Sequence, residues 1–498
     1  MNPSSKYRQL PLAIVGMACR VPGADNLGEF WDMLVAGRSA VGDLPPDRLD
    51  QELYYDPAKG SRGKTTTRRG ALASRRFDHD RCPISPELVR RSDPTHLVMC
   101  QTAAEALRHA DMDPMNLTLR NTGVYVGHTI GSGLAGDALC GAGVEAIEEC
   151  LRETDAFKSL SAEMQAKVLA EFVERMRRRY PRRAPDDRDL TSNMAAGIIS
   201  KGFGLTGPFM AVNAACASSL EALLQAGRAL ARGKIDMAIV GGASVCTRDW
   251  LVLFSVAQSM SATDSRPFDE AADGLIIAEA YAAVVIKTLE RAVADGDPIH
   301  GVIRGMGVSS DGRGKSLWAP RREGQVEAIR RAYDSGVDPA GVQYIEAHAT
   351  ATQVGDATEI AALAVAFRGV FPEGKKIPIT SAKANLGHAL EAAGLIGVVK
   401  TALCMRHGLI PAAAKVERLN PTIDWAAAPV YVPLEPTPWP CPADGSPRRA
   451  GVNAFGVGGL NVHVVLDEYR PGVMGDSSGA LAIAQRWPSG SATGPPLR

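Results

Sequence analysis

The chain has 498 residues, 45% of them hydrophobic, so it is long enough to bury one large core or two cores of ordinary size. Its 55 basic residues balance 55 acidic ones, which excludes the overall positive field that attracts nucleic acid or a membrane surface. Nine cysteines occur singly, without a CxxC pair or a Cys/His spacing suited to zinc. We therefore expect neither a disulfide framework nor a metal site.

The hydrophobic segments of the chain are short. The apolar stretch at residues 12–17 is too short for the core of a signal peptide, and no later run reaches the ~20 apolar residues of a membrane-spanning helix. These features predict a cytoplasmic protein with no membrane or nucleic-acid partner.

Short β-branched runs alternate with longer Ala- and Leu-rich segments, a pattern typical of an α/β protein whose strands are covered by helices. The expected strands, in chain order, are residues 12–15, 123–126, 209–212, 238–240, 283–286, 344–346, 377–380 and 464–466. The expected helices are residues 27–35, 95–110, 218–231, 324–333 and 386–406.

Residues 145–183 differ in composition, being rich in Ala, Glu and Arg with apolar residues at helical spacing, so we expect an amphipathic helical insertion there. Six arginines gather toward its end: Arg175, Arg177, Arg178, Arg179, Arg182 and Arg183. They are interpreted either as a docking surface for an acidic protein or as a solvated helix end that complements the helix dipole. Residues 470–498 are poor in apolar content and are expected to form a flexible tail or linker.

A cysteine lies at a predicted strand-to-helix turn. Residues 213–220 (Asn-Ala-Ala-Cys-Ala-Ser-Ser-Leu) follow the strand at 209–212 and open an apolar helix. Unpaired N–H groups and the helix dipole favour negative charge at this end, so they are expected to lower the pKa of the Cys216 thiol and make it a nucleophile. The alternative is a buried cysteine that acts as a small hydrophobic residue.

Two histidines follow predicted strands. His348 lies in residues 346–352 (Glu-Ala-His-Ala-Thr-Ala-Thr), and His388 ends residues 381–388 (Ser-Ala-Lys-Ala-Asn-Leu-Gly-His). Either histidine alone is more simply explained as a core residue with satisfied hydrogen bonds. Because two occur in matching positions, we expect both to face a cavity.

A glycine-rich turn is predicted between two strands at residues 453–461 (Asn-Ala-Phe-Gly-Val-Gly-Gly-Leu-Asn). It has neither a lysine nor GxGxxG spacing, which argues against a phosphate-binding loop. Glycines that bring backbone N–H groups close to a reacting oxygen, as in an oxyanion hole, fit the pattern better.

Further motifs occur in order at residues 13–20 (Ala-Ile-Val-Gly-Met-Ala-Cys-Arg), 30–31 (Phe-Trp), 77–78 (Phe-Asp), 93–94 (Asp-Pro), 266–269 (Arg-Pro-Phe-Asp), 272–274 (Ala-Asp-Gly), 310–312 (Ser-Asp-Gly) and 462–466 (Val-His-Val-Val-Leu). With the segments above, they resemble the β-ketoacyl synthase family, in particular the ketosynthase domains of polyketide synthases. The insertion and the segment around the cysteine are also similar to ketosynthases of enediyne and polyunsaturated fatty acid synthases.

The resemblance implies a duplicated thiolase fold with five layers, αβαβα, in a homodimer. One ketosynthase domain would span residues 1–469, with halves at roughly 10–265 and 266–469 and the insertion at about 132–190. The implied activity is decarboxylative Claisen condensation of an acyl chain with a malonyl-type extender, in polyketide or fatty acid biosynthesis. The implied partners are an acyl carrier protein, whose phosphopantetheine arm carries the substrate, and other polyketide synthase domains, with no cofactor bound by the chain itself.

The resemblance also assigns roles to residues. Cys216 would carry the acyl chain, while His348 and His388 would serve decarboxylation and stabilise the enolate. Lys383 and Glu359 would support them, and the backbone N–H groups of Cys216 and Val457 would form the oxyanion hole. The expected substrate-binding residues are Thr350, Thr352, Phe455, Val457 and Asn453.

The chain departs from the family pattern at several positions. Ala349 and Ala351 stand where glycines are usual, so their methyl groups are expected to narrow the pantetheine passage. Val457 replaces a usual Phe, and Leu460 replaces a usual Thr. Two alternative functions remain open: a ketosynthase-like acyltransferase that passes the acyl group to an alcohol or amine, and a non-catalytic chain-length-type partner subunit.

Overall fold

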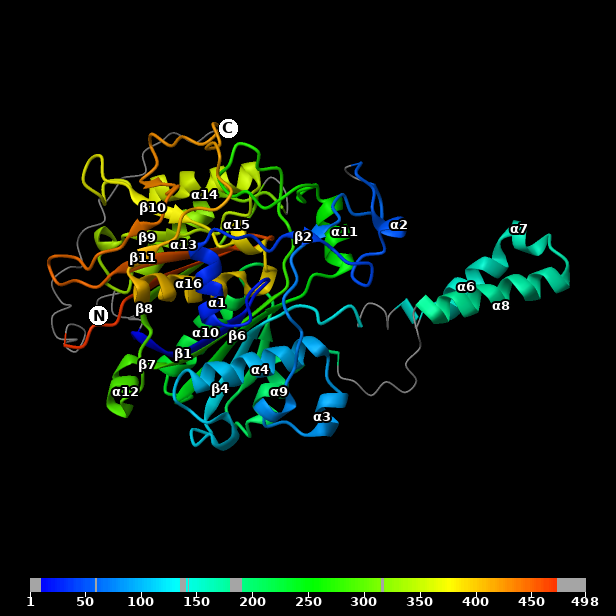
Figure 1. The fold of residues 1–498 in the computed structure, drawn as a ribbon, viewed down its shortest axis with the longest axis horizontal. Helices are drawn as coiled ribbons and strands as arrows, with labels where there is room; N and C mark the ends of the chain where they lie inside the picture. The colour runs from blue at the N-terminus through cyan, green and yellow to red at the C-terminus, as the bar shows by residue number, and fades with distance from the viewer. Residues whose placement is uncertain are drawn as a thin grey trace.

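Two similar halves form an eleven-stranded mixed sheet in the computed structural model, which describes residues 10–58, 61–134, 140–141, 143–179, 190–314 and 318–472 (Figure 1). In the first half, β4 (Thr122–Gly127) pairs in parallel with β5 (Phe209–Val212) and β6 (Met237–Ser244). β7 (Ala280–Thr288) then runs antiparallel to both β6 and β1 (Leu12–Arg20).

The second half repeats this arrangement. β9 (Tyr344–Glu346) pairs in parallel with β10 (Ile377–Thr380) and β14 (Arg449–Phe455), and β15 (Leu460–Asp467) runs antiparallel to both β14 and β8 (Gly301–Ser310). β1 pairs with β8 and so joins the halves, while β12 (Val430–Tyr431) extends the sheet beyond β10. Because β7 pairs with β6 and β1, the strands of the first half continue to residue 288.

Helices form three layers around the two half-sheets. α10 (Ser218–Ala231) and α16 (Ala393–His407) lie between the half-sheets, and Figure 1 shows them in the middle of the molecule. The outer layers contain α4 (Pro94–Arg108) and α9 (Met194–Gly202) over the first half, and α13 (Arg322–Tyr333) and α14 (Gln353–Ala366) over the second. This order confirms the expected five-layered αβαβα fold.

All eight expected strands are present, most of them with longer bounds. The helices expected at residues 27–35 and 218–231 occur with the same bounds. The remaining elements of the body are α1 (Leu27–Val35), β2 (Gly42–Asp43), α2 (Gln51–Tyr54), β3 (Arg69–Gly70), α3 (Pro86–Arg90), α11 (Arg248–Val256), α12 (Leu289–Asp295), β11 (Leu409–Ile410) and β13 (Thr437–Pro438).

The central helix α16 contains a buried ion pair. Every residue from Gly394 to Met405 is buried because both half-sheets enclose the helix. Lys400 lies among them, and its Nζ is 2.7 Å from a carboxylate oxygen of Glu346, at the end of β9. The Tyr344 hydroxyl donates to the same carboxylate at 2.6 Å. A buried charge is tolerated only when it is paired in this way, and the pair anchors α16 to the strand that precedes His348.

The helix expected over residues 386–406 is interrupted, so that expectation was wrong at its start. α15 (Lys383–Leu386) ends at Gly387, and α16 begins six residues later, after a 3-10 turn. Gly387 has a φ of 76° and a ψ of −172°, a conformation open essentially to glycine alone. The backbone N–H of His388 donates to the carbonyl of Ile276 at 2.6 Å. This contact with a distant segment overrides the local helical preference and leaves His388 in the gap.

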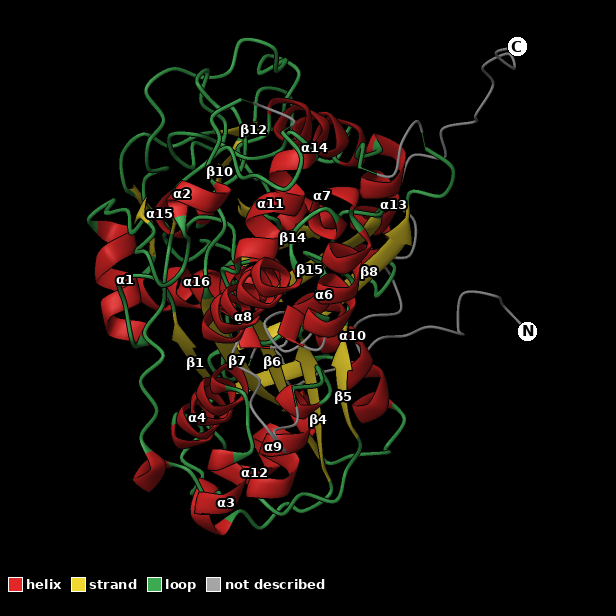
Figure 2. Ribbon diagram, turned by 90° about the vertical axis from the view of Figure 1, so that its right-hand side faces the viewer, coloured by secondary structure: helices red, strands yellow, loops and turns green. Residues whose placement is uncertain are grey.

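A helical hairpin projects from the body where the insertion was expected (Figure 1), and in Figure 2 it points toward the viewer. It consists of α6 (Val144–Glu153), α7 (Asp155–Lys158) and α8 (Ala162–Arg179). Arg182 and Arg183 lie outside the described residues, as does the expected tail from residue 473 onward.

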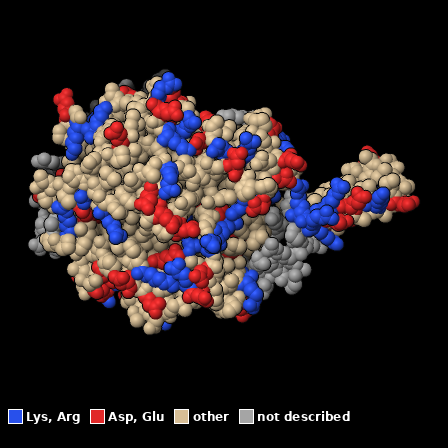
Figure 3. Space-filling model, viewed as in Figure 1, with Lys and Arg blue, Asp and Glu red and all other residues tan. Residues whose placement is uncertain are grey.

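Three of the arginines near the end of α8 have carboxylate partners within the chain. Arg178 is 2.6 Å from Glu174, Arg175 is 4.0 Å from Glu171, and Arg179 pairs with Asp50 of the body. Figure 3 shows positive and negative side chains side by side at the base of the hairpin. These pairs support the solvated helix end over a dedicated docking surface.

No helix in the described parts of the chain is both long enough and apolar enough to cross a membrane.

The conformation and surroundings of Gly387 should make this position intolerant of a side chain. A Cβ on Gly387 would lie 2.8 Å from the Ile276 carbonyl oxygen, whereas one on Gly296, with a similar φ of 71°, would meet nothing within 4 Å. Gly387→Ala should therefore lower the free energy of unfolding by about 1–3 kcal/mol beyond the loss in Gly296→Ala, because strain and a backbone clash add together. Urea denaturation of the two variants measures the difference. Equal losses would contradict a special role for Gly387.

Candidate active site

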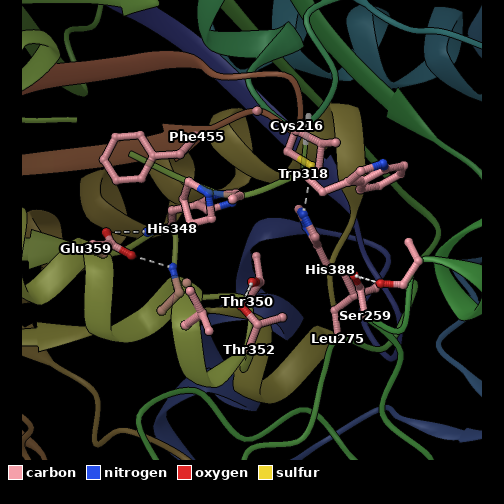
Figure 4. A pocket seen from close by; sticks show the side chains of 18 of the residues that line it. Cys216, Ser259, Leu275, Trp318, His348, Thr350, Thr352, Glu359, His388 and Phe455 are labelled. Carbon is pink, nitrogen blue, oxygen red and sulfur yellow. Dashed lines mark hydrogen bonds between the residues drawn. The ribbon is translucent and has the colours of Figure 1, made fainter. Parts of the chain in front are cut away.

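Cys216 lies at the turn between β5 and α10, as the sequence predicts. The preceding residue, Ala215, has a φ of 50°, a left-handed conformation that turns the chain sharply toward the helix. The Ser218 hydroxyl stabilises this turn by accepting from the Ala214 N–H at 2.8 Å and donating to the Ala215 carbonyl at 2.6 Å. The turn directs the Cys216 sulfur to Nε2 of His388 at 3.1 Å (Figure 4).

The two histidines meet at one edge of the sheet. His348 follows β9 and His388 follows β10, and these strands are parallel neighbours, so their carboxyl ends lie side by side. The centroids of the two imidazole rings are 5.5 Å apart, and the ring planes meet edge to face at an angle of 81°. The structure therefore brings together the three residues that the sequence singled out for chemistry.

Both histidines are held in the neutral form. Burial lowers the pKa of His348 well below its usual value, and the nearby Lys383 cation and His388 lower it further. Burial and Lys383 have the same effect on the pKa of His388. A neutral imidazole has one N–H donor and one acceptor nitrogen, so each ring is able to donate to an oxygen or accept a proton.

Burial has the opposite effect on the nucleophile. It raises the pKa of the Cys216 thiol to about 11, although hydrogen bonds from the backbone N–H groups of Val457 and of Cys216 itself lower it, as does Lys383. The expectation that the turn would lower this pKa was therefore wrong in its net effect, because desolvation outweighs the hydrogen bonds from the backbone N–H groups. The resting group is a thiol beside a neutral imidazole.

Glu391 is a buried acid close to this thiol that sequence reasoning missed. It lies three residues after His388 and is 3% exposed. Burial raises the pKa of its carboxyl group to about 7, although hydrogen bonds with Thr129 and Ser244 lower it. Its charge in turn raises the pKa of Cys216. Only the tertiary fold brings these residues together, so local sequence held no signal for the role.

Glu359 holds the turn that carries His348. Its carboxylate accepts from the N–H groups of His348 at 2.9 Å and Ala349 at 2.7 Å. It also accepts from the amide of Asn453 at 2.8 Å, and the Asn453 oxygen is 2.6 Å from Nδ1 of His463. Asn453 is thus held behind the histidine and does not line the cavity, so the expectation that it contacts substrate is replaced by a positioning role.

Lys383 is buried close to Cys216, His348 and His388. Burial lowers the pKa of its ammonium group, while the charges of Glu346, Glu359 and Cys216 raise it. Its link to Glu359 is electrostatic.

A cavity of about 600 Å³ opens onto Cys216, His348 and His388. Its lining also includes Thr350 and Thr352, whose hydroxyl oxygens are 3.1 Å apart, and Phe455 and Val457 from the glycine-rich turn. Of the two unusual alanines, Ala349 lines the cavity. Ala351 is fully buried, with a φ of 62°, and does not line it. The expected narrowing of the passage is therefore confined to Ala349.

Family models match almost the whole chain. The model described as "Beta-ketoacyl synthase, N-terminal domain" matches residues 9–292, and its C-terminal counterpart matches residues 300–417. A third, "Ketoacyl-synthetase C-terminal extension", matches residues 420–479.

Individual proteins agree with these models. The chain is 36% identical over 476 residues to 5-methyl-1-naphthoate synthase of Streptomyces sahachiroi, covering 93% of this chain and 24% of that protein. It is 34% identical over 466 residues to the mycocerosic acid synthase-like polyketide synthase of Mycolicibacterium smegmatis, covering 92% of this chain and 20% of that protein. The oxazolomycin ketosynthase domain of Streptomyces albus superposes with a TM-score of 0.78 at 32% identity, covering 93% of this chain and 74% of that one. The chain spans between 8% and 27% of the length of eight curated relatives that it matches.

The proximity of Glu391 predicts a pH-dependent brake on the thiol. Above pH 7 the ionised carboxylate disfavours the thiolate, so Glu391→Gln should speed alkylation of Cys216 by iodoacetamide at pH 8 by roughly two- to tenfold, since one pKa unit is a factor of ten. At pH 6, where the carboxyl is mostly protonated, the two proteins should react at similar rates. Glu163→Gln, at an exposed position on α8, is the control. An unchanged rate at pH 8, or an equal increase at both pH values, would rule out the electrostatic effect.

Proposed function

Because the chain belongs to the β-ketoacyl synthase family, we propose that it catalyses the decarboxylative Claisen condensation of polyketide assembly. The observation that carries the proposal is the 3.1 Å contact between Cys216 and His388, with His348 facing the same cavity. The donor and the extender would arrive as thioesters on the phosphopantetheine arm of an acyl carrier protein.

Loading begins with the thiol of Cys216. Its sulfur attacks the carbonyl carbon of the acyl thioester while its proton passes to Nε2 of His388, and the proton then leaves with the pantetheine thiolate. The N–H groups of Cys216 and Val457, which hydrogen-bond to the sulfur, lie beside the reacting carbon. They would therefore hold the tetrahedral oxyanion.

Condensation uses both histidines. The bond between the malonyl carboxylate and C-2 breaks, CO₂ leaves, and the electron pair forms an enolate. Its oxygen accepts hydrogen bonds from His348 and from His388, the latter as the neutral tautomer whose proton is on Nε2. C-2 then attacks the Cys216 thioester, and the sulfur leaves as thiolate. Neutral imidazoles suit this step because each retains a donor N–H at neutral pH. Thr350 and Thr352 would bind the amides of the arm.

The alternatives fit the site less well. A non-catalytic partner subunit has no need of a cysteine in contact with a histidine. Transfer to an alcohol or amine needs a base, but it does not need a second histidine in the same cavity.

The assembly would be a homodimer formed through β5. This strand lies at the end of the sheet, and Phe209 and Met210 on it are 40% and 39% exposed. An edge strand with exposed apolar residues pairs readily with a second copy.

All nine cysteines are free thiols, which suits the reducing cytoplasm.

Loading tests the nucleophile. Cys216→Ala should abolish the mass increase that follows incubation with an acyl carrier thioester, because no other cysteine lies beside a catalytic histidine in the described chain. Cys150→Ala, at an exposed position on α6, should load like the parent protein. An acyl adduct of full occupancy on the Cys216→Ala protein would refute the assignment.

The condensation step tests the role of His348, for which no hydrogen bond to the Cys216 sulfur is seen. His348→Ala should still load an acyl group but release CO₂ from malonyl carrier protein about 10²-fold more slowly or worse, because the enolate loses a donor. Single-turnover CO₂ release from preloaded enzyme measures this step alone. Undiminished release would favour simple acyl transfer.

A further inference from the structure

Trp318 lines the catalytic cavity, although it lies outside the family motifs of the chain. It stands between β8 and α13, and its side chain is 39% exposed, which places part of the ring at the cavity rim. In Figure 4 the indole lies beside Cys216 and His388. Trp318 and Cys216 therefore line the same cavity.

Two aromatic residues, the buried Phe254 and the half-buried Trp250, hold the Trp318 ring in place. Trp318 packs edge to face against Phe254 of α11, with ring centroids 5.9 Å apart at 81°. Phe254 is 5% exposed and packs in turn against Trp250, also at 5.9 Å. Edge-to-face aromatic pairs are stabilising, so the indole has a support that resists displacement.

Trp318, Phe254 and Trp250 form an aromatic wall, and Phe254 connects it to the apolar residues around Cys216. Phe254 belongs to the same buried cluster as Cys216, Leu275 and Leu390. Phe254 thus belongs both to the support of the Trp318 ring and to the apolar cluster around Cys216, while Thr350 and Thr352 supply hydroxyl groups elsewhere in the lining. A rigid apolar wall offers a bulky group no hydrogen bonds and limits the width available to it.

Resting on the proposed condensation, we propose that Trp318 is a specificity-determining residue that admits straight-chain acyl groups to Cys216 and excludes those branched beside the thioester. A straight chain lies flat against the indole, whereas a methyl branch at C-2 needs the volume that the ring occupies. Steric discrimination of one methyl group in an apolar site typically amounts to roughly 10- to 200-fold. The substrate class is therefore an unbranched aliphatic acyl thioester.

The first test compares loading of Cys216 by butyryl and 2-methylbutyryl pantetheine thioesters in parallel. The parent protein should load the straight chain at least about tenfold faster. Trp318→Ala should bring the two rates within about threefold of each other by raising the branched rate, and Trp318→Phe should lie between. Val354→Ala, at a 67% exposed residue of the rim, should leave the ratio unchanged. A damaged fold lowers both rates and does not move their ratio.

The second test does not depend on catalysis. N-ethylmaleimide and N-tert-butylmaleimide react with thiols by the same chemistry and differ in bulk, so their rates at Cys216, each divided by the rate with glutathione, report access alone. Trp318→Ala should raise the tert-butyl rate selectively. The role of Trp318 is overturned if Trp318→Ala and the parent protein show the same ratio of butyryl to 2-methylbutyryl loading and the same ratio of ethyl to tert-butyl maleimide rates. If the maleimide ratio shifts as expected while no thioester loads, the access role stands and the proposed condensation fails.

Discussion

The contact between the Cys216 sulfur and Nε2 of His388 joins the two halves of the fold, and the rest of the site is arranged around it. Cys216 follows an edge strand of the first half, and His388 follows a strand of the second. Their separation of 3.1 Å requires that both half-sheets stay in register against the central helices. It also requires the break at Gly387, which stops the second segment from continuing as a helix. Global packing and one glycine conformation therefore set the distance between the proposed nucleophile, Cys216, and its proposed base, His388.

Burial governs the chemistry of the site more than the local dipole does. Desolvation keeps the thiol protonated and both imidazoles neutral, while Lys383 remains close enough to lower the pKa of each imidazole. Such a site keeps the thiolate fraction of Cys216 small at neutral pH, and it retains hydrogen-bond donors at the two neutral imidazoles. The buried pair of Glu346 and Lys400 lies behind this arrangement and holds β9 to α16 without entering the cavity.

The sequence was sufficient to predict the positions of the candidate site residues that follow the ends of strands. Cys216, His348 and His388 each follow a run of strand-forming residues, so their convergence was predictable from strand order and family resemblance. Features that depend on contacts between distant parts of the chain could not be predicted in this way. β8 was missed because it contains Gly305 and Gly307, which are needed where α13 approaches: a Cβ on Gly305 would lie 1.9 Å from the Ala332 carbonyl oxygen. Glu391 and Trp318 reach the site through side-chain packing, for which local sequence carries no signal.

Transfer of the Cys216-bound acyl group is the step that most directly tests decarboxylative condensation. Enzyme loaded from an acyl carrier thioester should be mixed with malonyl carrier protein and followed by intact mass of both proteins together with CO₂ release. We expect that the adduct disappears from Cys216, that one CO₂ is released per adduct lost, and that the carrier gains a β-ketoacyl group longer by two carbons. Loss of the adduct to water, an alcohol or an amine without release of CO₂ would contradict the condensation.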